Sequence, residues 1–127
     1  MSKYGNVALV ATGLVLWEPG TSPEVAWALA AERIFPASPS SREKGCPKGA
    51  FLGLCEEGLV SGVKSGNYTR SVLNKGYALK AVRHLRGRPE LASDPHRLWA
   101  FATDGKAIKP NSQMDVVIAL WAEGLLR

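Results

Sequence analysis

The chain lacks any hydrophobic run long enough to cross a bilayer. Charged residues or glycines interrupt its apolar stretches well before the roughly 20 residues that a spanning helix needs. Residues 1–6 also lack the basic, apolar and small-residue order of a signal peptide. These absences predict a cytoplasmic protein with reduced thiols and no membrane partner.

Cysteine and histidine are scarce, with two of each among the 127 residues. The spacings from Cys46 to Cys55 and from His84 to His96 match no compact zinc signature. Along one helix the two cysteine Cα atoms would also lie roughly 13 Å apart, which is beyond the reach of a disulfide. We therefore expect two unpaired thiols, no metal site and no cofactor.

Acidic residues are absent between residues 61 and 88, where seven of the 16 basic residues lie. The rest of the chain therefore carries nine basic and 11 acidic residues, so this segment accounts for the whole net charge of +5. A helical wheel places four of the basic residues on one face, opposite an apolar face. They are Lys75, Lys80, Arg83 and Arg86. The pattern predicts an amphipathic helix with a basic outer face.

Two interpretations of this basic face remain open. It could contact nucleic-acid phosphates, with each neutralised charge adding salt-dependent affinity. It could equally face solvent and pair with carboxylates elsewhere, such as Glu56 and Glu57. The basic positions include no aromatic residue to stack on bases and no Asn or Gln to read them, so a nucleic-acid partner has weak support.

Strict alternation of apolar and polar residues is also missing, so the sequence predicts no sheet. Apolar residues recur instead at helical spacing, and two segments open on a capping residue followed by proline, at Ser22-Pro23 and Asp94-Pro95. The expected helices lie near residues 3–17, 23–35, 47–60, 70–86, 95–102 and 112–125, joined by loops such as 36–45. We predict a single domain, 1–127, folded as a compact all-α bundle of five or six helices.

Both cysteines lie in residues 44–58, beside a proline at an expected helix start. On a helical wheel Cys55 falls in the middle of the apolar arc, which predicts a buried core residue. Gly49, Ala50 and Gly53 occupy the other side. Because glycine weakens a helix, this bare strip indicates that something packs closely against it. A second helix is the expected neighbour, and a ligand is the alternative.

The start of this helix is the candidate ligand site. Cys46 is expected at the N-cap, where free backbone N–H groups and the helix dipole stabilise negative charge. The N–H groups of Lys48, Gly49 and Ala50 could hold a phosphate or a carboxylate. The ammonium groups of Lys44 and Lys48 would strengthen that site. The same field could activate the Cys46 thiol as a nucleophile, or the segment could do no more than begin a helix.

Four segments carry a resemblance to known proteins: residues 44–58 (KGCPKGAFLGLCEEG), 66–69 (GNYT), 74–78 (NKGYA) and 113–121 (QMDVVIALW). Together they resemble a small family of uncharacterised bacterial and archaeal all-α proteins that share the segment K-G-C-P-K-G-A-F-x-G-L-C. The resemblance covers nearly the whole chain. It implies a compact helical domain with no assigned activity, so it transfers no catalytic residue to this sequence.

The sequence leads to one main hypothesis and two alternatives. The main hypothesis is a small binding module whose site, for an anionic small molecule or a protein partner, is the helix start at Cys46-Pro47. One alternative is a thiol-dependent enzyme centred on Cys46, although no general base can be identified beside the thiol. The other is a nucleic-acid-binding domain that uses the basic helix 70–86. Whether the protein is an enzyme, and whether it forms homo-oligomers, stays open at this stage.

Overall fold

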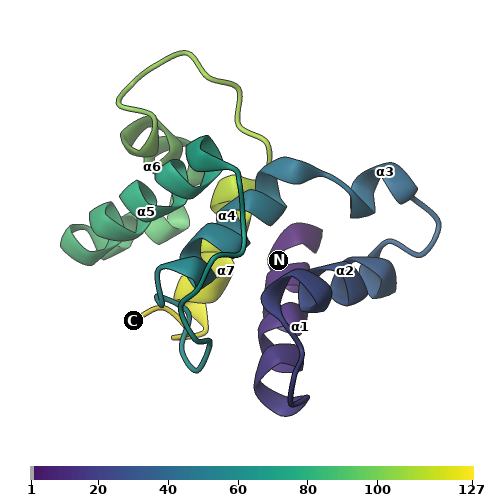
Figure 1. The fold of residues 1–127 in the computed structure, drawn as a ribbon. Coiled ribbons are helices and arrows are strands. Elements are labelled where there is room, and N and C mark those ends of the chain that lie inside the picture. Colours follow the sequence, from purple (N-terminus) through teal and green to yellow (C-terminus); the bar gives the residue numbers. More distant parts are fainter. Residues whose placement is uncertain (1) are drawn as a thin grey trace.

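Seven α-helices and one 3-10 helix form between residues 2 and 127, the part of the chain that this computed structural model describes (Figure 1). In chain order they are α1 (Lys3–Trp17), α2 (Pro23–Ile34), α3 (Pro39–Arg42), α4 (Gly45–Glu56), α5 (Val72–Gly87), η1 (Pro89–Ser93), α6 (Pro95–Ala102) and α7 (Gln113–Ala122). Six of the α-helices have eight or more residues, and residues 2–127 form no strand beyond an isolated bridge between Val60 and Leu126. The predicted all-α bundle of five or six helices is confirmed.

Side-chain caps explain where four of these helices begin. Each capping oxygen accepts a hydrogen bond from a backbone N–H in the first turn, which satisfies a donor that the helix leaves free. The capping residues are Ser2 for α1, Ser22 for α2, Ser38 for α3 and Asp94 for α6. The starts expected at Ser22-Pro23 and Asp94-Pro95 are therefore confirmed. Within residues 2–127, the N-termini of α4, α5 and α7 carry no such side-chain bond.

The helices are arranged around α4 and α7. The hairpin of α1 and α2 lies on one side of this pair, and α5 with α6 lies on the other (Figure 1). Aromatic pairs join neighbouring elements: the rings of Trp27 and Phe51 link α2 to α4 at 5.2 Å, and those of Tyr77 and Trp99 link α5 to α6 at 5.1 Å. One continuous cluster of buried apolar side chains draws on all six longer helices.

The two thiols lie where the helical wheel places them. Cys55 is fully buried in the apolar cluster, whereas Cys46 is half-buried, and neither forms a disulfide. Burial raises the pKa of the Cys55 thiol well above its ordinary value, because a thiolate would lose its hydration there. Cys55 is therefore a core residue, as predicted.

Helix α4 differs from the prediction at both ends. It begins at Gly45 instead of Pro47, so Lys44 is the N-cap residue and Cys46 lies inside the first turn. It ends at Glu56 instead of residue 60, because Gly58 adopts a left-handed conformation with φ of 72° that a helix cannot continue. The loop expected at 36–45 also contains the short helix α3, which Ser38 caps.

The strip of small residues on α4, which contains Gly49 and Gly53, packs against α5. A Cβ atom placed on Gly53 would lie 2.6 Å from the Cβ of Lys75 and 2.8 Å from its Cα, and one on Gly49 would lie 3.0 Å from the Cβ atoms of Ser71 and Asn74. A second helix is thus the close neighbour of the strip, as expected. The two helices run in a similar direction along this contact, because Gly49 faces Ser71 and Gly53 faces Lys75. Their N-terminal ends consequently lie beside each other.

Candidate anion-binding site

A pocket of about 280 Å³ lies where the N-terminal ends of α4 and α5 meet. Helix α4 contributes Gly45, Lys48 and Gly49 to its lining, and the segment that leads into α5 contributes Thr69, Arg70 and Ser71. The glycine strip brings these two segments together, because side chains at Gly49 and Gly53 would hold the helices apart. The pocket is therefore a direct result of the close helix packing.

The start of α4 keeps backbone donors free at this pocket, whereas at the start of α5 the Ser71 N–H donates to the Thr69 hydroxyl at 3.0 Å and the Val72 N–H donates to the Arg70 carbonyl at 3.0 Å. In α4, the N–H groups of Gly45 and Cys46 belong to the first turn and have no carbonyl partner within the helix. In α5, the Ser71 hydroxyl accepts a hydrogen bond from the Asn74 side chain at 2.8 Å, so it does not cap the backbone. Each helix also directs the positive end of its dipole toward the pocket. Anions are stabilised by this arrangement.

The charged side chains of the pocket have opposite signs. Lys48 and Arg70 supply two positive charges, and Glu24, from the first turn of α2, supplies one negative charge. None of the ion pairs formed within residues 2–127 involves Lys48 or Arg70. The net charge of the lining is therefore positive, and its two cationic groups keep their hydrogen-bond donors available for a ligand.

The structure divides the five residues that the sequence assigns to this site. Lys48 and Gly49 line the pocket, whereas the half-buried Cys46, in the first turn of α4, is not among its lining residues. Lys44 turns away, and its Nζ atom lies 5.1 Å from the centre of the Tyr4 ring. Ala50 is fully buried. Because α4 begins at Gly45, the N–H groups of Gly49 and Ala50 belong to the internal hydrogen bonds of the helix. The free donors expected at those two residues lie instead at Gly45 and Cys46.

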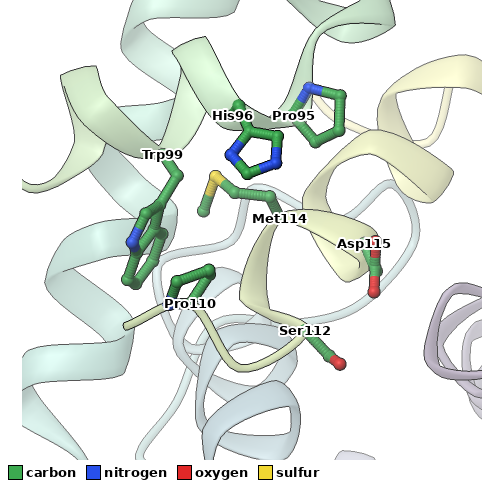
Figure 2. Close-up of a pocket in the computed structure, with 7 residues that line it drawn as sticks. All are labelled: Pro95, His96, Trp99, Pro110, Ser112, Met114 and Asp115. Carbon is green, nitrogen blue, oxygen red and sulfur yellow. The ribbon is translucent and has the colours of Figure 1, made fainter. Parts of the chain in front are cut away.

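Neither histidine lies in the pocket at the start of α4. His84 stacks on the Phe101 ring at 4.7 Å, in the groove between α5 and α6. His96 lines a separate pocket with Trp99 (Figure 2). Residues 2–127 also contain no cluster of three or more histidine, cysteine or carboxylate side chains that could hold a metal ion.

Three members of the predicted basic face have partners within the chain. The Lys75 ammonium lies 2.5 Å from a Glu56 carboxylate oxygen and 2.6 Å from one of Glu57. Lys80 pairs with Asp104, whose pKa it lowers, and Arg86 donates to the backbone oxygen of Arg127. Arg83 is the exposed member without an ion pair in the described chain. The alternative that these charges pair with acidic residues elsewhere therefore holds for Lys75, with Glu56 and Glu57, and for Lys80, with Asp104.

Glu56 holds the segment before α5 in place. Its carboxylate accepts hydrogen bonds from the backbone N–H groups of Tyr68 and Thr69, at 2.7 and 3.2 Å, and from Lys75. The bond from Lys75, followed by the two backbone bonds, lowers the pKa of Glu56 to about 2. This carboxylate thereby fixes Thr69 and, through it, the approach of Arg70 to the pocket.

Replacement of Glu56 by Gln is expected to change how stability depends on pH. The lowered pKa means that the ionised Glu56 stabilises the folded state fully above its ordinary pKa near 4.5, and that this contribution is lost as pH falls toward about 2. Wild type should therefore lose more stability than Glu56→Gln across that interval. Urea unfolding at several pH values would measure the difference, and parallel curves for the two proteins would contradict the role given to Glu56.

The whole chain matches one family model. Residues 1–127 align with the model of a family of unknown function, DUF6979. The chain belongs to the DUF6979 family. Membership confirms the expectation of an uncharacterised family, and it assigns no activity to this DUF6979 chain. Comparisons with curated proteins and with solved structures give no significant match. No helix in the described part of the chain is both long and apolar enough to cross a membrane.

Proposed function

We propose that this protein is a small binding module that holds an anionic group between the N-terminal ends of α4 and α5. The observation that supports the proposal is the meeting of two helix starts without side-chain caps at one pocket that Lys48 and Arg70 flank. The start of α4 offers free N–H donors, and both helix dipoles favour negative charge at the same place. The two basic side chains add charge-assisted hydrogen bonds.

The pocket sets limits on the ligand. Its volume of about 280 Å³ is small for a drug-sized molecule and suits a phosphate, a sulfate or a short carboxylate-bearing group. The hydroxyls of Thr69 and Ser71 can donate to such an anion. The Glu24 carboxylate accepts only, so a ligand with a hydroxyl or ammonium group beside its anionic group is bound better than one without.

Thermal unfolding against phosphate concentration tests this proposal. At constant ionic strength, inorganic phosphate should raise the melting temperature of wild type, because a ligand at 100 times its Kd stabilises the folded state by about 2.7 kcal/mol. The substitutions Lys48→Ala and Arg70→Ala should each reduce this response. They should alter stability without phosphate only slightly, because neither side chain forms an ion pair within residues 2–127.

Arg83→Ala is the matched control, since Arg83 is an exposed cation on the outer face of α5, away from the pocket. It should keep the wild-type response to phosphate. Loss of the response in Arg83→Ala, with Lys48→Ala unaffected, would instead place the anion on the basic helix. A wild-type protein that phosphate does not stabilise would contradict the proposal altogether.

A further inference from the structure

Trp17 is the most exposed large apolar side chain of the described chain, with 84% of its surface open to solvent. It is the last residue of α1 and is followed by a tight turn, in which the Thr21 N–H donates to the Glu18 carbonyl at 3.1 Å. The neighbouring Leu16 is 45% exposed. A fixed turn thus presents an indole ring, with a carboxylate beside it, at one end of the molecule.

A pocket of about 240 Å³ lies between α6 and the start of α7 (Figure 2). Trp99 and Met114, which are 6% and 4% exposed, form its apolar base, and Pro95, His96 and Pro110 complete the lining. The side chains of Ser112 and Asp115, which also belong to the lining, point away from His96 and Trp99 in Figure 2. The volume is below the usual range for small-molecule sites and is comparable with one large aromatic side chain.

Trp17 cannot reach this pocket within its own chain. The N-terminal end of α1 lies against α7, since a Cβ atom on Gly5 would sit 3.0 Å from the Cβ of Ala119 and 3.2 Å from the carbonyl oxygen of Asp115. From Gly5 to Trp17 the helix rises roughly 18 Å away from that end. Figure 1 shows the C-terminal end of α1 and the start of α7 at opposite ends of the bundle.

We propose that Trp17 of one copy occupies the Trp99–Met114 pocket of a second copy of this chain. Tryptophan and methionine favour contact with an aromatic ring, and an indole fills a cavity of this size. Because the ring and the pocket lie at opposite ends, two antiparallel copies can form both contacts at once, which closes the assembly as a dimer.

The charges around the two elements are complementary. Glu18 is exposed beside Trp17, whereas His96 lies at the rim of the pocket and the exposed Lys109 precedes Pro110. The Glu18 carboxylate of one copy thus approaches His96 and Lys109 of the other. This charge complementarity favours a second copy of the chain as the occupant of the pocket. The dimer is weak and concentration-dependent, since each contact buries little more than one aromatic side chain.

Sedimentation velocity from micromolar to near-millimolar concentration tests this dimer. Wild type should shift from monomer to dimer across that range, and Trp17→Ala should raise the dissociation constant about tenfold or more. His96→Glu, which places a carboxylate opposite Glu18, should also weaken association. A mixture of the two variants should associate more strongly than either alone, because the intact pocket of Trp17→Ala can accept the Trp17 of His96→Glu.

Val72→Ala is the control for nonspecific association, because Val72 is 80% exposed on α5 and lies outside the pocket that receives Trp17. It should dimerise like wild type. Circular dichroism and melting temperature should show that every variant is folded. A wild-type protein that stays monomeric throughout the range would overturn the proposal. So would a dimer that Trp17→Ala and His96→Glu leave unchanged.

Discussion

Gly53→Ala is expected to destabilise the protein by about 1–3 kcal/mol or more, the range for overpacked sites. The added methyl group would lie 2.6 Å from the Cβ and 2.8 Å from the Cα of Lys75, and the Cα belongs to the backbone of α5 and cannot rotate away. Helix α5 would have to move outward from α4. Because the same contact forms the anion pocket, the variant should also respond less to phosphate. Chemical unfolding with and without phosphate measures both effects.

Gly76→Ala is the matched control for this prediction. Gly76 lies inside α5, and a Cβ atom placed there would meet no other atom within 4 Å. Alanine should therefore stabilise the helix by about 0.5–1 kcal/mol through the backbone effect alone. If Gly53→Ala were as stable as Gly76→Ala, the close contact between α4 and α5 would be wrong.

The second large effect concerns the two thiols. In the native protein, Cys46 should react with a thiol reagent at least about a thousandfold faster than Cys55, because the buried thiol is reached only when the fold opens. The raised pKa of Cys55 slows it further, since the thiolate is the reactive form. Mass spectrometry of partly labelled protein would give the two rates.

Single-cysteine variants make this measurement unambiguous. In Cys46→Ser only the slow reaction of Cys55 should remain. In Cys55→Ser only the fast reaction of Cys46 should remain. In denaturant the two thiols should react at similar rates, which shows that the difference arises from the fold. Equal rates in native protein would contradict the burial of Cys55.

The helices could be predicted because local signals agree along most of the chain. At α2 and α6, a capping oxygen, a proline and an apolar stripe all place the start at the same residue. Helix α4 lacks a capping side chain, and there the prediction set the start two residues late, at Pro47 instead of Gly45. This small error moved the expected free donors from Gly45 and Cys46 to residues that the helix itself bonds.

Half of the candidate site could not be predicted, because it depends on which helix packs on the glycine strip. The sequence indicates that something lies close to Gly49 and Gly53, but it does not identify α5 as the neighbour. Arg70 and Ser71 reach the pocket only through that pairing and through the hydrogen bonds to Glu56. The expected helix 70–86 included Arg70 and Ser71, whereas in the structure Ser71 is the N-cap residue of α5 and Arg70 precedes it.

The basic face shows a second limit of sequence patterns. A helical wheel places Lys75 and Lys80 on the outer face, but it carries no information on partners from other elements. In the structure Lys75 lies instead on the side of α5 that packs against Gly53 of α4. Lys75 pairs with Glu56 and Glu57 at the end of α4, and Lys80 pairs with Asp104 after α6. These carboxylates are far away in sequence, so a wheel cannot show that two of its four basic residues are paired with carboxylates in the fold.

Amide chemical shifts during a phosphate titration test the central claim most directly. At constant ionic strength, inorganic phosphate should produce saturable shifts at the backbone N–H groups of Gly45, Lys48 and Ser71, which border the pocket between α4 and α5. Lys48→Ala should weaken the binding constant obtained from those shifts. Saturable shifts centred on Lys80 and Arg83, or shifts that never saturate at any residue, would contradict an anion site at the two helix starts.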